Sequence, residues 1–210
     1  MAANAYPTAK PFMPARRTVA ALRASVQECR GCPLYANATQ AVFGAGPAHA
    51  GLMLVGEQPG DQEDRQGLPF VGPAGTVLDR ALAEVGIERD DAYLTNTVKH
   101  FKWRPRGTRR IHDKPSLTEQ RACRPWLDEE IALVAPRAIV LLGATAAQSL
   151  LGREFRVTRD RGRLLESDLA EIVMATIHPS AVLRADDREE AFDGLVADLR
   201  VAAAAFFRAA

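Results

Sequence analysis

The sequence predicts an α/β fold, a single domain in which a central, mostly parallel four-stranded sheet is flanked by helices. Short apolar runs alternate along the chain with segments of helical periodicity, which is typical of parallel sheets. The length of 210 residues fits one domain. A composition of 47% hydrophobic and 25% charged residues is that of a globular protein, which excludes disorder for most of the chain.

The strands are expected where the apolar runs are continuous, as in buried parallel strands, at 52–55, 93–98, 138–142 and 172–177. Helices are expected between and after them, at 75–85, 117–134, 143–151 and 187–207. Apolar residues repeat along one face of the first helix. Ser116 and Glu119 form a capping box that predicts where the second begins.

Residues 1–20 are interpreted as a flexible Ala/Pro-rich leader, and residues 21–210 as the folded domain. The leader lacks the continuous apolar core of a signal peptide. No run approaches the 18 apolar residues of a membrane-spanning helix, so we expect no membrane contact. Three cysteines without an export signal favour a thiol or metal role over disulfides. We therefore expect a cytoplasmic monomer.

The formal net charge of +1 conceals a concentrated basic segment. Between Lys99 and Lys114 the segment carries seven basic residues and one acidic residue, so its net charge is +6 and the rest of the chain sums to −5. Such a segment suits a loop that contacts phosphates. A solvated basic loop explains the charge equally well.

Ligands of open α/β sheets bind at the carboxyl ends of the strands. The predicted loops at those ends are 57–73, 99–115 and 178–184. They contain most of the unusual residue clusters, so the functional site is expected there.

The spacing of Cys29 and Cys32 allows both thiolates to bind one metal, and Cys123 and His100 can complete the ligand set. Zinc and an iron–sulfur cluster are both chemically reasonable. The alternative is a redox-active C-x-x-C motif with an unrelated buried Cys123.

Four carboxylates fall within eight residues after the first strand, which favours a site that stabilises a cation or activates a nucleophile over a phosphate cradle. Phe70 lies between prolines and can stack on a flat ligand, although a lone Phe is more often a core residue. A carboxamide within a strand, as at Asn96, needs partners or recognises a ligand. His178 and His112 have ordinary alternatives, as a structural residue at a strand end and as a surface histidine in the basic loop.

Together these motifs resemble the uracil-DNA glycosylase superfamily over roughly residues 29–199. The matching motifs are Gly56-Glu57-Gln58-Pro59-Gly60, Leu68-Pro69-Phe70-Val71-Gly72-Pro73, Asn96 and His178-Pro179-Ser180. The three cysteines resemble the iron–sulfur branch, related to family 4. Family 4 has a cysteine in place of His100 and lacks the insertion Arg109-Arg110-Ile111-His112. These departures, together with Gln58, resemble the UdgX class.

The resemblance implies a structural 4Fe–4S cluster held by Cys29, Cys32, His100 and Cys123. It implies a uracil pocket in which Phe70 stacks on the base, Asn96 hydrogen-bonds its edge, and Gly56, Gln58 and Asp61 lie around it. His178 would stabilise the departing uracil. Lys102, Arg106, Arg109, Arg110 and Ser180 would contact DNA.

The same resemblance implies that His112 bonds covalently to the DNA. Loss of uracil passes through an oxocarbenium-like transition state, and a histidine held below the sugar would capture C1′ before water does. We expect Glu57 to orient His112 or to take its proton. The products would be free uracil and a stable single-turnover DNA–protein crosslink.

Two other functions remain open at this point. A conventional, multiple-turnover glycosylase would use water, and His112 would only position DNA. A non-catalytic DNA-binding module with a metal staple would bind any single strand without preference for uracil. Uracil-containing DNA is the expected partner; single-stranded DNA is expected, and the resemblance allows double-stranded DNA as well, without setting a preference.

Overall fold

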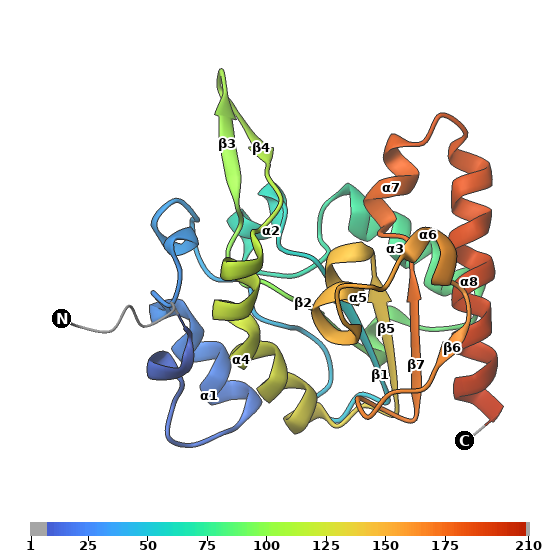
Figure 1. Cartoon of the computed structure of the whole chain (residues 1–210), viewed down its shortest axis with the longest axis horizontal. Helices are drawn as coiled ribbons and strands as arrows, with labels where there is room; N and C mark the ends of the chain where they lie inside the picture. Colours follow the sequence, from blue (N-terminus) through green and yellow to red (C-terminus); the bar gives the residue numbers. More distant parts are fainter. Residues whose placement is uncertain (1–7, 209–210) are drawn as a thin grey trace.

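A five-stranded sheet forms the centre of the molecule in the computed structural model, which describes residues 8–208 (Figure 1). Its strands are β1 (Leu52–Gly56), β2 (Ala92–Asn96), β5 (Ala138–Leu142), β6 (Leu164–Leu165) and β7 (Ile172–Thr176). They lie in the order β2-β1-β5-β7-β6. The first four are parallel, as predicted, and β6 pairs antiparallel with β7. The sequence did not predict β6, because two residues are too few to show a periodic pattern.

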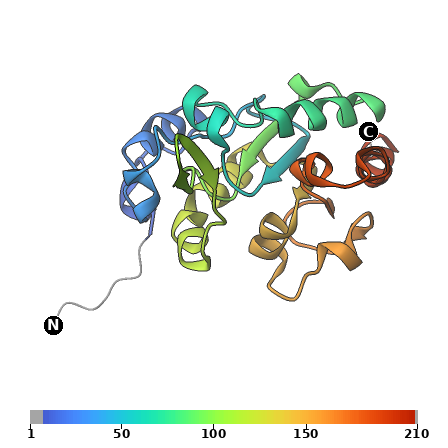
Figure 2. The ribbon, with the colours of Figure 1, turned by 90° about the horizontal axis from the view of Figure 1, so that it is seen from above.

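Helices cover both faces of the sheet and bury alternate side chains of each strand. Leu52 and Leu54 pack with α3 (Pro73–Glu84) and α8 (Arg188–Arg208). Met53 and Val55 pack with α4 (Leu117–Val134) and α5 (Ala144–Leu151). Seen from above, α3 and α4 lie on opposite sides of the sheet (Figure 2). Each face is therefore dry, and the carboxyl edge is the part of the sheet left open to a ligand.

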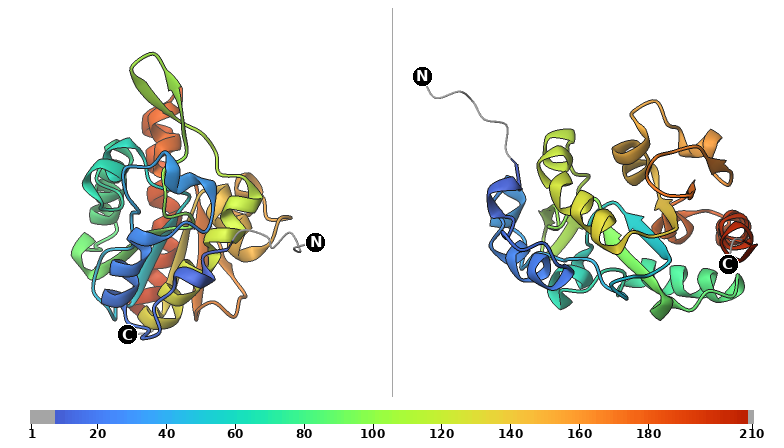
Figure 3. Two further views of the ribbon diagram at one scale, coloured as in Figure 1. Left: turned by 90° about the vertical axis from the view of Figure 1, so that its left-hand side faces the viewer. Right: turned by 90° about the horizontal axis from the view of Figure 1, so that it is seen from below.

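The N-terminal part of the described chain packs beside α4 rather than leading away from it (Figure 3). Its elements are η1 (Lys10–Phe12), α1 (Val19–Ser25), η2 (Val26–Glu28) and η3 (Pro33–Ala36). Ala9 is fully buried, and its N–H donates to the carbonyl of Ala122 at 2.8 Å. Residues 8–20 thus differ from the flexible leader that was predicted; residues 1–7 lie outside the described part.

All three predicted site loops contain regular structure. The basic segment forms a hairpin of β3 (Trp103–Arg106) and β4 (Arg109–His112), which projects beyond the carboxyl edge of the sheet (Figures 1 and 3). Gly107 makes its turn with φ +59°. The other two segments contain the short helices α2 (Asp61–Gln66) and α7 (Pro179–Arg184).

The remaining elements are η4 (Arg89–Asp91) and α6 (Val157–Asp160). Within residues 8–208, no helix combines the length and the apolar character needed to cross a membrane.

Candidate active site at the carboxyl edge of the sheet

A cleft of about 760 Å³ opens where the parallel strands end. The turns after β1, β2, β5 and β7 all contribute to its walls, and so does the hairpin. Among its lining side chains are Glu57, Phe70, Asn96, His112, Thr145 and His178. The fold thereby brings together residues that are more than 120 positions apart in the chain.

Phe70 and Asn96 meet over Gly56 at the end of β1. A Cβ on Gly56 would collide with the Asn96 Oδ1 and lie 2.7 Å from the Phe70 ring, so only glycine fits there. Phe70 is buried and has φ +55°, a strained conformation for a residue with a side chain. The buried carboxamide of Asn96 makes no hydrogen bond with any residue of the described chain and faces the cleft. Both its donor and its acceptor are available to a ligand.

His178 precedes α7, and its ring lies 6.1 Å from that of Phe70, between centroids. Burial lowers the pKa of His178 to about 4, with Arg184 and His112 acting in the same direction against Glu57. The ring is therefore neutral at pH 7. The Ser180 N–H donates to His178 Nδ1 at 3.1 Å, which assigns the proton of the neutral ring to Nε2.

His112 and Glu57 are in contact across the cleft, with 3.3 Å between His112 Nε2 and Glu57 Oε1. The His112 side chain is half exposed, so it is accessible to a ligand. Thr145 also donates a hydrogen bond to Glu57. Burial would raise the pKa of Glu57, but the hydrogen bonds from His112 and Thr145 lower it below its usual value. Glu57 is thus an anion beside the imidazole.

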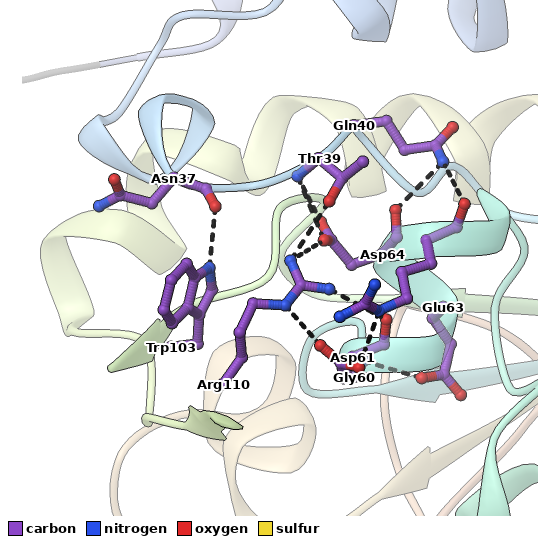
Figure 4. Close-up of polar contacts among 10 residues, drawn as sticks. Asn37, Thr39, Gln40, Gly60, Asp61, Glu63, Asp64, Trp103 and Arg110 are labelled. Atoms are coloured by element: carbon purple, nitrogen blue, oxygen red, sulfur yellow. Dashed lines mark hydrogen bonds and ion pairs between the residues drawn. The ribbon is translucent and has the colours of Figure 1, made fainter. Parts of the chain in front are cut away.

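Arg110 attaches the hairpin to the body of the protein (Figure 4). Its guanidinium pairs with Asp61 and lies 2.6 Å from an Asp64 oxygen, and it also donates to Thr39. Burial would raise the pKa of Asp61, but hydrogen bonds from Arg65 and Arg110 lower it. The structure differs here from the expectation that Arg110 faces DNA and that Asp61 lies beside the base. Their opposite charges attract each other, and Asp61 is outside the cleft lining.

Gln58 fixes the two ends of the hairpin. Its side-chain amide donates to the carbonyls of Lys102 and Asp113, each at 3.1 Å, and its oxygen accepts from the Lys102 N–H at 3.2 Å. These backbone segments flank the paired residues Trp103 and His112. Gln58 does line the cleft, but its carboxamide is already committed to the hairpin instead of to the expected contact with a base.

The basic segment presents fewer free charges than its composition predicts. Lys99 is fully buried, and Lys102 pairs with Glu119 at 3.0 Å. The predicted DNA contact of Lys102 therefore competes with an ion pair. Arg106 and Arg109 are exposed, stand opposite each other in the hairpin, and have no ion pair within the described residues. Ser180 interacts with His178 Nδ1 through its hydroxyl at 2.8 Å, so it also orients that ring.

Lys99 pairs with Glu130 in the interior. Lys99 Nζ also donates to the Asn96 carbonyl at 2.7 Å, and the Lys99 N–H donates to Cys123 Sγ at 3.2 Å. Glu130 accepts from Tyr93 and Thr95 at 3.0 Å each. A buried polar network thus connects the end of β2 with the region of the cysteines.

Cys29, Cys32 and Cys123 are buried free thiols in one apolar cluster. Burial raises the pKa of Cys123 to about 12, despite the opposing effect of Lys99, and it raises that of Cys32 as well. The charge of Cys29 also raises the pKa of both thiols, so the three sulfurs lie close enough to interact electrostatically. Thiolates so placed need a compensating cation, and a metal centre supplies one.

His100 is buried directly after Lys99, and burial lowers its pKa to about 4, so its ring is a neutral nitrogen donor. Among residues 8–208, no three His, Cys, Asp or Glu side chains are arranged around a single point as ligands of one metal ion. By its chemistry, a donor set of three thiols and one imidazole can hold an iron–sulfur cluster or a zinc ion.

Thr145 was not predicted as a cleft residue, and Glu63 was predicted only as one of the four carboxylates near the site. Thr145 lies in the first turn of α5, and Glu63 accepts hydrogen bonds from the N–H groups of Gly60 and Gly72 at 3.1 and 2.8 Å. Thr145 follows a predicted strand, so its position at the carboxyl edge was a usable signal. The hydrogen bond from Gly60 is local, because Glu63 forms a capping box with Gly60 at the start of α2, whereas the bond from Gly72 joins a second loop and leaves no local pattern.

The fold and this cleft define an α/β protein with a ligand site at the carboxyl edge of a parallel sheet, and comparison with known proteins identifies its family. Residues 43–200 match the uracil DNA glycosylase superfamily, so the chain belongs to that superfamily. It is 40% identical over 160 residues to a Type-4 uracil-DNA glycosylase of Thermotoga maritima, covering 76% of this chain and 80% of that one. A Type-4 enzyme of Pyrobaculum aerophilum is 39% identical over 166 residues, with 76% and 81% covered. One of Archaeoglobus fulgidus is 38% identical over 173 residues, with 79% and 83% covered.

Proposed function

We propose that this protein excises uracil from DNA and that His112 then forms a covalent bond with C1′ of the deoxyribose. Membership of the superfamily and the Type-4 relatives support the excision. The observation that carries the covalent step is the His112–Glu57 pair, placed in the same cleft as Phe70, Asn96 and His178.

The base enters the cleft as an extrahelical nucleotide. The Phe70 ring stacks on its face, and the unpartnered carboxamide of Asn96 hydrogen-bonds its Watson–Crick edge. The strained φ of Phe70 and the missing Cβ of Gly56 keep these two groups close together. A flat base that carries both a hydrogen-bond donor and an acceptor can stack on the Phe70 ring and pair with the Asn96 carboxamide.

Departure of the base needs stabilisation of its negative charge. The bond between N1 and C1′ breaks with its electron pair going to uracil, which leaves as an anion. Neutral His178 donates its Nε2–H to the uracil O2, while Ser180 holds the ring from its Nδ1 side. The anionic Glu57 stabilises the oxocarbenium ion that remains on the sugar.

The sugar cation is then captured by a nucleophile. The His112 nitrogen that carries a lone pair bonds to C1′, and the proton on its other nitrogen passes to the Glu57 carboxylate. The hairpin holds the imidazole in the cleft, so its effective concentration exceeds that of water. After this proton transfer the imidazole could leave C1′ only as an anion, and that anion is a poorer leaving group than the uracil anion. The adduct therefore persists and the protein completes one turnover.

The hairpin also provides the phosphate contacts of this proposal. Arg106 and Arg109 project from it into solvent, where they meet the DNA backbone. Arg110 and Lys102 have a different role and position the hairpin. Their ion pairs with Asp61 and Glu119 hold it over the cleft.

The proposed cofactor is a 4Fe–4S cluster held by Cys29, Cys32, Cys123 and His100. When bound, it would connect three parts of the chain: the N-terminal segment that carries Cys29 and Cys32, helix α4, and the segment after β2. The N–H groups of Trp126 and Lys99 donate to the sulfurs of Cys29 and Cys123 at 3.3 and 3.2 Å, as hydrogen bonds to thiolate ligands do. The cluster takes no part in the steps above.

A conventional multiple-turnover enzyme is the second candidate, and the names of the Type-4 relatives favour it. In that case water captures C1′ and abasic DNA accumulates in excess over protein. His112 would then only orient DNA.

The test mixes the protein with an end-labelled single strand that contains one uracil and analyses the boiled mixture on a denaturing gel. The proposal predicts a shifted band equal in amount to the protein, absent with a thymine strand and absent for His112→Ala. DNA that runs unshifted but breaks in alkali would support the second candidate. Intact DNA would contradict both.

A further inference from the structure

A second, smaller groove of about 240 Å³ lies between α4 and α5, and the function proposed above makes no use of it. Arg121, Arg124 and Arg153 contribute to its walls, and no carboxylate does. Arg121 comes from α4, whereas Arg153 follows the end of α5. Guanidinium groups from two different elements therefore converge on one concave surface.

The three arginines differ in how far their charge is already used. Arg124 pairs with Asp128 and donates to the Ser149 carbonyl at 2.6 Å, so it bridges α4 and α5. Arg121 and Arg153 are exposed and form no ion pair within residues 8–208. Arg124 thus shapes the groove, while the other two present uncompensated positive charge to a ligand. A planar guanidinium group can bind two phosphate oxygens at once.

The groove and the main cleft are lined by neighbouring positions of the same two segments. On α5, Thr145 lines the cleft and Ser149 lines the groove, one helical turn or about 6 Å further on. Along the segment that leads into α4, Lys114 lines the cleft and Leu117 lines the groove. Lys114 at the cleft and Arg121 and Arg153 at the groove therefore place positive charge at both sites. Figure 1 shows α4 and α5 side by side below the projecting hairpin.

We infer that this groove binds the backbone phosphates of the DNA strand on one side of the nucleotide held in the cleft. The inference rests on the proposed function for the position of that nucleotide. The exposed hairpin arginines would then serve the other side of the strand. Phosphodiester is the ligand chemistry, because the groove offers charge and helix-borne polar groups but no aromatic surface for a base.

The first test needs no catalysis. Binding of a labelled, uracil-free single strand of about 15 nucleotides is measured by anisotropy over a series of salt concentrations. The double variant Arg121→Gln/Arg153→Gln should weaken binding several-fold and reduce the salt slope by about 1.4, which is 0.7 for each lost contact. The matched control Arg200→Gln/Arg208→Gln removes the same charge from exposed positions of α8.

The control should leave the slope of the wild-type protein unchanged. Equal slopes for the two double variants would overturn the inference. Inorganic phosphate, at a concentration equal to that of the phosphates in the strand, should not displace the strand. Displacement would show that the groove binds a free anion instead of the DNA backbone.

The second test locates the strand. Uracil is placed near the 5′ end or near the 3′ end of otherwise identical strands, and its release is measured in a single turnover. Arg121→Gln/Arg153→Gln should slow release from one strand only, and Arg106→Gln/Arg109→Gln from the other. Equal slowing of both strands by the groove variant would contradict a one-sided track. If the wild-type protein releases no uracil at all, the proposed function fails, while the salt slopes still decide the groove.

Discussion

The ion pair between Lys99 and Glu130 provides a stringent test of the packing around the site. Both side chains are 0% exposed. Besides Lys99, Glu130 accepts hydrogen bonds from the Gly44 N–H at 2.9 Å and from the hydroxyls of Tyr93 and Thr95 at 3.0 Å. The substitution Lys99→Met removes the cation and leaves the carboxylate buried among neutral donors.

A buried charge without its partner destabilises a protein by about 3 to 5 kcal/mol. In a chain of this length, each kcal/mol lowers the melting temperature by roughly 2–4 °C. Lys99→Met should therefore melt about 6–20 °C below the wild type. Because Lys99 also donates to the Asn96 carbonyl, uracil release should slow in the same variant.

The assay is thermal and denaturant unfolding of the wild-type protein, Lys99→Met, Glu130→Gln and the double variant, each as purified with its cofactor. The glutamine of the double variant is neutral and still accepts hydrogen bonds, so the double variant should be more stable than Lys99→Met alone. A loss below about 1 kcal/mol for Lys99→Met, or strictly additive losses, would refute the reasoning.

Three further predictions concern the cleft and the cysteines. The pKa of His178 lies near 4 in the folded protein, below that of a free histidine. The unfolded chain therefore binds the extra proton, and this residue lowers stability between about pH 6.5 and pH 4 by up to about 3 kcal/mol. His178→Gln should weaken the pH dependence of unfolding in this range and leave the share of buried His100, whose pKa is also near 4; an unchanged profile would contradict the assigned burial. Gly56→Ala should displace Asn96 or Phe70, because the added Cβ would collide with them. Uracil release in single-turnover assays should slow by about a hundredfold without loss of DNA binding. A wild-type rate would show that the packing of Asn96 and Phe70 on Gly56 is loose. Cys123→Ser should lose iron and visible absorption together, and full iron content would remove this residue from the ligand set.

Local patterns were sufficient to predict the four parallel strands and the four helices α3, α4, α5 and α8, which are half of the α-helices in the described chain. The four parallel strands are dry on both faces and therefore stand out as continuous apolar runs. Helix α4 has the predicted bounds, because the capping box of Ser116 and Glu119 fixes its start. The segment of the basic hairpin has no such apolar alternation, and the sequence predicted only a loop there.

The arrangement of charges depended on tertiary contacts that the sequence does not display. Glu130, the partner of Lys99, is 31 positions away, and Asp61 is 49 positions from Arg110. Lys99 and Arg110 were therefore counted with the charges available to DNA. The positions at strand ends were better predicted, because topology alone carries Asn96 and His178 to the same edge of the sheet.

The most direct test of the central claim identifies the residue that becomes bonded to DNA. The crosslinked protein is treated with nuclease and then with trypsin, and the peptides are sequenced by mass spectrometry. Trypsin cleaves after Arg110 and does not cleave between Lys114 and Pro115, so the modified peptide should span residues 111–121 and carry the deoxyribose on His112. A deoxyribose on any other residue, or released uracil with all peptides unmodified, would contradict the account.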